Sequence, residues 1–247
     1  MKIRHIILLL LVSLSGCKKE QLDDCFSSTG DDISIARPLK SFDCITIGDK
    51  FKLILSQDTT QPERIILTGG ENILEGVSAE VDNGLLTIEN CNKCNFVRSY
   101  NRMITLEVFV HNLTELSLFG ATNITNSDTL HLKDLYIYHS ALEDLELTVD
   151  VTNEIYVESI NSGGTVLHGN TKILKGSIEE ITNLDARDLL AEEALVDIHT
   201  PLDCYINATK LIYVGIYNKG NMYYVKEPSG LKELYEQKGT GQLLKLP

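Results

Sequence analysis

The thiol groups are the first side chains of this 247-residue chain whose spacing could do chemistry. Cys91 and Cys94 form a Cys-x-x-Cys pair, a spacing found in redox motifs and in half of many zinc sites. The sequence contains no second pair of this kind, and no two of its six histidines stand at a metal-ligand spacing. No helix is expected to begin at Cys94, as it would in a redox motif. We therefore predict no metal, no cofactor and a structural role for the cysteines.

The acidic side chains are the second candidates. Two carboxyl groups about 5 to 9.5 Å apart can hydrolyse a glycosidic bond. The sequence holds 35 acidic residues, so many carboxylates are expected on its surface without any catalytic role. No Gly-x-Ser-x-Gly nucleophile elbow and no glycine-rich phosphate loop accompany them. We predict that the protein is not an enzyme, and a glycan-active hydrolase or lyase is the alternative. The carboxylates that such an enzyme could use are Asp144, Glu154, Glu158, Glu179, Glu180, Asp185 and Asp188.

The N-terminus has the pattern of a signal peptide. Two basic residues precede an apolar run over residues 6–12, which is too short for a membrane-spanning helix of roughly 20 residues. Leu14-Ser15-Gly16-Cys17 follows and resembles the lipobox of bacterial lipoproteins. We predict that residues 1–16 are removed and that lipid, including palmitate, is attached to Cys17. Lys18 stands where an aspartate would signal retention in the inner membrane, so we expect the outer membrane or the cell surface.

Net charge limits the partners of the mature chain. Lys2 and Arg4 leave with the signal peptide, so 20 basic residues face 35 acidic ones, a net charge of −15 (20 − 35). Such a surface repels phosphate backbones, and we predict no nucleic-acid partner. Residues 17–32 are polar and rich in Asp, Ser and Gly, which predicts a flexible tether. Residues 33–247 form the expected single domain.

Strand patterns dominate this domain. Residues 51–55 and 104–110 alternate apolar and other side chains with the period of two that a half-buried strand shows. Asn83-Gly84 lies between two apolar runs and predicts a hairpin turn. Only residues 189–195 and 231–237 are weak helix candidates. The domain is therefore expected to be nearly all β.

An apolar-x-apolar dyad recurs through the second half of the chain every 17 to 22 residues. A fixed period near 20 predicts a solenoid whose units bury their apolar side by stacking. Because helix is scarce and the strands are short, each unit should be one coil of a parallel β-helix, with a β-sandwich as the alternative. Glu158 and Glu179 should then occupy similar positions on neighbouring coils. The dyads begin at Leu116, Leu135, Ile155, Leu174, Leu195, Ile212 and Leu234, and the second apolar points are Ile124, Leu145, Val166, Leu184, Ile206, Met222 and Leu243.

The order of several short segments resembles the GIN-domain family of auto-transporter adhesin head domains, which is common in lipoproteins of Bacteroidetes. The resemblance extends from about Phe42 to the C-terminus and implies a right-handed β-helix in the cell envelope. At the coil turns, where the family often has Ser-Gly-Ala or Ser-Gly-Ser, this chain has Phe119-Gly120-Ala121 and His139-Ser140-Ala141. The segments that carry the resemblance are residues 42–47, 51–55, 70–74, 83–88, 220–228 and 238–241.

Two kinds of covalent modification follow from resemblance as well. Lipoproteins of this type tend to pair a Cys-Phe-x-Ser-Thr-Gly start with a Lys-Cys-Asn-aromatic-Val-Arg-Ser-Tyr segment, and both are present here. This implies a disulfide between Cys25 and Cys94. Asp58-Thr59-Thr60 and Asp128-Thr129-Leu130 resemble the sites at which Bacteroidetes attach O-glycans to exported proteins, which makes Thr59 and Thr129 candidate sites.

These features together predict a lipid-anchored, adhesin-like binding or structural module of the cell envelope. Its partners would be the membrane, through the lipid on Cys17, and a glycan or a surface protein. Tyrosines recur on the predicted coils and could form an aromatic binding face, although strands favour aromatic residues for structural reasons too. These tyrosines are Tyr136, Tyr138, Tyr156, Tyr205, Tyr213, Tyr217, Tyr223 and Tyr224.

Overall fold

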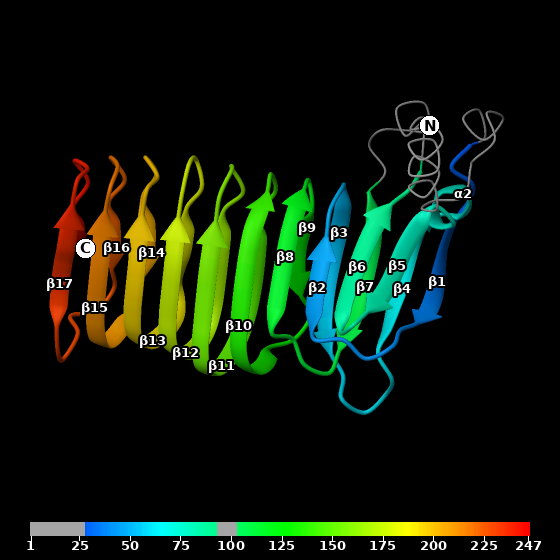
Figure 1. The fold of residues 1–247 in the computed structure, drawn as a ribbon, viewed down its shortest axis with the longest axis horizontal. Helices are drawn as coiled ribbons and strands as arrows, with labels where there is room; N and C mark the ends of the chain where they lie inside the picture. The colour runs from blue at the N-terminus through cyan, green and yellow to red at the C-terminus, as the bar shows by residue number, and fades with distance from the viewer. Residues whose placement is uncertain (1–27, 93–102) are drawn as a thin grey trace, which may run out of the picture.

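The computed structural model describes residues 28–92 and 103–247, which form a parallel β-helix (Figure 1). The chain winds through strands that pair mainly with the coil before and the coil after. The strands are β1 (Asp32–Pro38), β2 (Cys44–Ile47), β3 (Phe51–Gln57), β4 (Arg64–Gly70), β5 (Val77–Asp82), β6 (Leu85–Asn90), β7 (Ile104–Val110), β8 (Glu115–Gly120), β9 (Asn123–Asn126), β10 (Leu130–Ala141), β11 (Leu145–Ser159), β12 (Thr165–Ile178), β13 (Leu184–Ile198), β14 (Cys204–Ile206), β15 (Ala208–Ile216), β16 (Met222–Tyr224), β17 (Lys232–Gln237) and β18 (Leu243–Lys245), and the short helix is α2 (Glu71–Leu74).

The strands build two walls that enclose the core. The front wall contains β6, β2, β8, the second halves of β10 to β13, β15 and β17. The back wall contains β7, β3, β9, the first halves of β11 to β13, β14, β16 and β18. The long strands bend from back to front where their pairing register shifts, for example between Val151 and Glu154. One continuous strand thus supplies side chains to both walls.

Successive coils confirm the predicted period. Leu116 pairs with Ile137, which pairs with Val157, and the column continues through Gly176 and Val196. The intervals in this column are 21, 20, 19 and 20 residues, because each coil needs about this length to pass along both walls and two turns. The winding is right-handed, as is nearly universal for parallel strands joined by a crossover (Figure 1). The parallel β-helix is therefore confirmed, and the β-sandwich alternative is not adopted.

Five of the predicted apolar points are one or two residues out of phase. Two of them, Leu116 and Leu234, lie in the next inward column, where they pair with Ile137 and Val214. The other three have a common cause. Some inward positions of the β-helix are occupied by small or polar side chains. A search of the sequence for an apolar repeat selects a large aliphatic residue one or two positions away instead. The predicted points Leu195, Val166 and Ile206 are replaced in their columns by Ala194, Thr165 and Cys204.

The core consists mainly of stacked aliphatic side chains that are fully buried. One polar cluster interrupts these stacks at the end of β10. The buried His139 ring lies 2.8 Å from the Thr165 hydroxyl through Nδ1, and Thr165 Oγ1 lies 2.7 Å from Ser159 Oγ. His139 Nε2 lies 3.0 Å from the backbone carbonyl of Glu143. Because both ring nitrogens have partners, the buried imidazole does not leave an unpaired polar group.

The N-terminal end of the β-helix is closed by antiparallel strands. β1 pairs with β4 over seven residues, and β4 pairs with β7, so the parallel stack stops at β7 on the back wall. The Arg37 guanidinium donates hydrogen bonds to the carbonyls of Leu74 and Val77, which ties β1 to the segment after α2. The predicted hairpin is confirmed, because β5 and β6 pair around Asn83 and Gly84 with φ values of 49° and 83°.

Both weak helix candidates were wrong. Residues 189–195 belong to β13 and residues 231–237 almost coincide with β17. Pairing with neighbouring coils outweighs the helix preference of their Ala, Leu and Glu residues. α2 was not predicted. Within residues 28–92 and 103–247, no helix has the length and apolar character that crossing a bilayer requires.

Candidate functional site

Aromatic and acidic side chains recur on the outward side of the front wall, where four of the five aromatic ring contacts of the described residues lie. We call it the tyrosine face and define it by three rows that run along the β-helix, one residue from each coil. The first row contains Tyr136, Tyr156, Lys175, Leu195 and Tyr213, the second Tyr138, Glu158, Ser177, Asp197 and Gly215, and the third Ser140, Ile160, Glu179, His199 and Tyr217.

Tyr136 and Tyr156 form the first aromatic pair of this face, on neighbouring coils. Their ring centroids are 5.5 Å apart. The Tyr136 hydroxyl donates a hydrogen bond of 2.8 Å to the Glu158 carboxylate. Burial, followed by this bond to the carboxylate, raises the pKa of Tyr136 to about 12. The phenol therefore stays protonated and remains a donor at physiological pH.

A second aromatic group occupies the C-terminal coils. Tyr213 and Tyr235 stack with centroids 4.3 Å apart and planes 9° apart, and the Tyr235 hydroxyl donates a hydrogen bond to Asp197. Burial and this bond raise the pKa of Tyr235. Gly215 makes room for the group, since a Cβ atom there would lie 2.5 Å from the Asp197 carboxylate and 2.9 Å from the Tyr235 hydroxyl. Tyr235 was missed in the sequence analysis, although it follows the dyad point Leu234 directly, as Tyr136 follows Leu135.

Tyr217 extends this group toward the turn. Its ring stacks on His199 with centroids 4.1 Å apart, and its hydroxyl donates a hydrogen bond of 2.7 Å to Glu236. Lys238 lies 5.3 Å from the same ring and 2.6 Å from Glu236. Stacked rings cover each other's faces, so the tyrosine face presents ring edges, hydroxyls and carboxylates to solvent.

The structure divides the eight predicted tyrosines among three environments. Tyr136, Tyr138, Tyr156, Tyr213 and Tyr217 belong to the tyrosine face. Tyr205 and Tyr223 form a separate pair on the back wall with centroids 5.4 Å apart, and Arg187 lies 4.0 Å from the Tyr205 ring. Tyr224 is buried in the core. The aromatic residues therefore do not form a single continuous surface.

The two carboxylates expected at matching positions on neighbouring coils are offset from each other and bind other side chains. Glu158 pairs with Ser177 rather than with Glu179, so the two glutamates are two residues out of register. Glu158 accepts a hydrogen bond from Tyr136, and Glu179 accepts one of 3.1 Å from Ser177. The expectation of similar positions was wrong because the coil between them has 19 residues rather than 21.

The other candidate carboxylates mostly have partners of their own. Lys175 lies 2.7 Å from Glu154, and Arg187 lies 2.8 Å from Asp185. Asp144 accepts a hydrogen bond from the Gly164 amide, and Asp188 lies 3.7 Å from His168. Glu180 lies exposed in a turn with φ of 56°. Among the described residues, no group of three or more His, Cys, Asp or Glu side chains could hold a metal ion.

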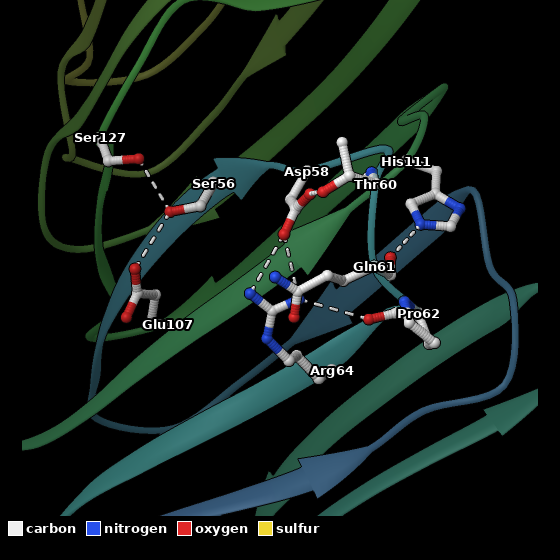
Figure 2. A network of polar contacts seen from close by, with 9 residues as sticks. All are labelled: Ser56, Asp58, Thr60, Gln61, Pro62, Arg64, Glu107, His111 and Ser127. Atoms are coloured by element: carbon white, nitrogen blue, oxygen red, sulfur yellow. Dashed lines mark hydrogen bonds and ion pairs between the residues drawn. The ribbon is translucent and has the colours of Figure 1, made fainter.

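The candidate glycosylation sites lie at the edge where β3 and β9 end. Thr59 is exposed in the loop between β3 and β4, and Thr129 is half-buried between β9 and β10. Figure 2 shows how Asp58 holds the first loop, since it accepts hydrogen bonds from Thr60 and lies 3.2 Å from the Arg64 guanidinium. The hydrogen bonds from Thr60, followed by Arg64, lower the pKa of Asp58. The loop therefore presents Thr59 on an ordered backbone.

The cysteines fall into two groups. Cys44 and Cys204 are free thiols, and burial raises the pKa of Cys204 to about 12. Cys91 takes part in a disulfide bond. Cys17 and both partners of the predicted Cys25–Cys94 disulfide lie outside the described residues.

Comparison with known proteins identifies the family. The sequence profile described as "Putative auto-transporter adhesin, head GIN domain" matches residues 41–228, about three quarters of the chain. The protein belongs to the GIN-domain family. The predicted resemblance is confirmed. The chain matches none of the curated proteins with which it was compared.

Solved structures share the fold of this GIN-domain protein. A "putative adhesin" from Bacteroides fragilis has a TM-score of 0.81 at 19% identity, and the match covers 89% of this chain and all of that one. A "putative lipid binding protein" from Parabacteroides distasonis has a TM-score of 0.64 at 16% identity, covering 88% and 98%. A "putative adhesin" from Parabacteroides merdae has a TM-score of 0.61 at 17% identity, covering 88% and 97%. At these identities the likeness concerns the fold.

Proposed function

We propose that this GIN-domain protein is a lipid-anchored, adhesin-like module of the outer membrane or cell surface that binds a partner through the tyrosine face and catalyses no reaction. The observation that carries the proposal is the row structure of that face, which repeats aromatic and acidic groups over successive coils. Solenoids commonly use such extended surfaces for binding. The names of the B. fragilis and P. merdae neighbours support an adhesive role.

The chemistry of the face favours a polar partner, either a glycan or a surface protein. Its hydroxyls and carboxylates already form hydrogen bonds among themselves, so the groups are held in fixed positions before the partner arrives. A fixed surface loses little conformational entropy on binding, which favours affinity. Carboxylates that serve tyrosine hydroxyls are poorly placed to act as a catalytic acid and base.

A glycan array probed with the mature protein tests this function, and the chain offers a matched pair of variants. Tyr156 on the tyrosine face and Tyr223 on the back wall are both half-buried, and each contacts a tyrosine ring on the neighbouring coil. Tyr156→Ser should weaken binding to any array hit by about tenfold, as expected for an anchoring aromatic side chain. Tyr223→Ser should leave binding unchanged. Equal losses would contradict the proposed face, and cleavage of the bound glycan would identify an enzyme instead.

The lipid anchor has its own test. Metabolic labelling with palmitate should mark the wild-type chain and leave Cys17→Ser unlabelled. The labelled protein should fractionate with the outer membrane, and protease added to intact cells should degrade it if it faces outward. A wild-type chain without label would contradict the anchor.

We also propose the Cys25–Cys94 disulfide, which would tie the tether to the first coils. Peptide mapping without reduction should recover one peptide pair containing these two cysteines. Because Cys91 takes part in a disulfide, the same map must assign its partner. A peptide that joins Cys91 to Cys25 or to Cys94 would replace the proposed pairing, as would free thiols at both positions.

A further inference from the structure

Exposed apolar side chains gather along one edge of the β-helix. The upper edge, at the top of Figure 1, consists of the turns that lead from the front wall to the back wall. Residues 28–92 and 103–247 contain eight large exposed hydrophobic side chains, and three of them, at Leu85, Leu190 and Leu231, lie toward the opposite, lower edge. The other five lie along the upper edge at Met103, Phe119, Leu142, Ile181 and Leu202.

The most exposed members of this apolar edge are turn residues. Leu142 has a relative exposure of 60% and Ile181 of 63%, because both sit at the tips of turns and point away from the core. From β7, which follows Met103, to β14, which follows Leu202, the back wall advances by six strand spacings, or about 29 Å. Single exposed apolar residues are common, but five of the eight lie along this one edge, and this uneven distribution makes the edge a candidate interaction surface.

The described chain enters the β-helix at the same edge. Asp32, the first residue of β1, pairs with Gly70, the last residue of β4. β4 runs antiparallel to β7, whose first residue Ile104 pairs with Phe51, the first residue of β3 after the turn from the front wall. Cys17 precedes Asp32 by 15 residues, which span at most about 50 Å. A lipid on Cys17 would therefore keep the apolar edge within reach of the bilayer.

The charges beside the apolar tips select the kind of lipid. Glu143 follows Leu142 directly, Glu180 precedes Ile181 directly, and both glutamates are exposed. Anionic headgroups would repel these carboxylates, whereas zwitterionic headgroups carry no net charge. The edge therefore fits a zwitterionic lipid surface.

We propose that the apolar edge lies on the zwitterionic lipid surface that holds the anchor, with the β-helix axis parallel to the membrane. The proposal rests on the lipid anchor of the proposed function. It differs from an upright arrangement, in which only the N-terminal coils approach the bilayer. In the parallel arrangement the tyrosine face stands perpendicular to the membrane and is accessible from the side.

Single tryptophans test the contact directly, since the chain contains none. The full-length lipidated protein is reconstituted on phosphatidylcholine vesicles as Leu142→Trp, Ile181→Trp or Leu190→Trp. Leu190 is exposed at 39% near the lower edge and serves as the matched control. Brominated phosphatidylcholine should reduce the fluorescence of the first two variants at least twofold and leave Leu190→Trp unchanged. Replacing half of the lipid by phosphatidylglycerol should weaken the quenching.

Flotation of the same samples separates the two proposals. If all variants float with the vesicles but neither upper-edge tryptophan is quenched, the anchor stands and the apolar-edge contact is wrong. Equal quenching in all three variants would also overturn it, and quenching that persists with phosphatidylglycerol would overturn the preference for zwitterionic lipid. If neither the wild type nor any variant floats, the anchor itself is wrong, and the contact falls with it. Circular dichroism of each variant shows that the turn substitutions leave the fold intact.

Discussion

Replacing His139 by leucine should remove a specific pH dependence from the stability of the protein. The imidazole is fully buried between Leu118 and Ser159 on the neighbouring coils. Burial lowers its pKa, although the carbonyl of Glu143 and the charge of Asp144 act in the opposite direction. The folded protein therefore resists protonation of this ring, while the unfolded chain takes up the proton with a pKa near 6.5.

The sign and size of the effect follow from proton linkage. A folded-state pKa below the unfolded one means that the unfolded chain binds more protons once the pH falls below about 6.5, so stability is lost with acidification. The loss between pH 7.5 and 5.5 can reach RT ln(11/1.1), or about 1.4 kcal/mol, which is the limit for a ring that stays neutral in the folded protein over this range. His139→Leu removes this loss. The variant also loses the ring's contacts with Thr165 and Glu143, which should cost ~1–2 kcal/mol at pH 7.5.

Urea unfolding followed by far-ultraviolet circular dichroism measures both effects, with wild type and variant compared from pH 7.5 to 5.5. The other described histidines are partly or fully exposed and are the same in both proteins, so their contribution cancels in the difference. The variant should be less stable at pH 7.5, and the difference in unfolding free energy between the two proteins should narrow on acidification, by up to about 1.4 kcal/mol. A gap that stays constant would refute the assignment of the pH dependence to His139.

Two further predictions concern the backbone and the surface. Gly169 has a φ of 107°, and a Cβ there would lie 1.9 Å from a carbonyl oxygen of the preceding coil, so Gly169→Ala should lower the free energy of unfolding by ~2 kcal/mol or more. Gly48→Ala meets open space and should be nearly neutral, and comparable losses in the two urea titrations would contradict the steric argument. Attached O-glycans should make the intact mass of the exported protein greater than the mass of the lipidated chain. Thr59→Ala and Thr129→Ala should each reduce this excess, and a mass without added glycan would rule out both sites.

The fold class and the coil length could be predicted because both depend on a regular property of the sequence. Stacked coils need an apolar side chain at nearly the same interval, and this interval is visible without any structure. It was harder to predict which residues of each coil point into the core. Ala194 and Thr165 occupy inward columns, yet Leu195 and Val166 next to them look more like core residues. The core tolerates Thr165 only because His139 and Ser159 bind its hydroxyl, which no local pattern reveals.

The residue types of the candidate site could be predicted from the sequence, but the positions of these residues on the two walls could not. The sequence marked recurrent tyrosines, but which wall a tyrosine belongs to depends on where each long strand bends. Tyr156 and Tyr205 look alike in the sequence, and the structure places them on opposite walls. The exposed turn tips Leu142 and Ile181 carried no signal, because single apolar residues in turns are common.

The pairing of β1 with β4 has a mechanical consequence. If a bound partner pulls the protein away from the membrane in the proposed arrangement, the force would pass from the proposed lipid anchor through Asp32 into β1. With the β-helix axis parallel to the membrane, that force acts along the strand, so the register from Asp32–Gly70 to Pro38–Arg64 is loaded in shear. Seven residue pairs then share the load, whereas a force across the strand would open them one at a time. A short antiparallel strand can in this way hold an adhesive head against tension.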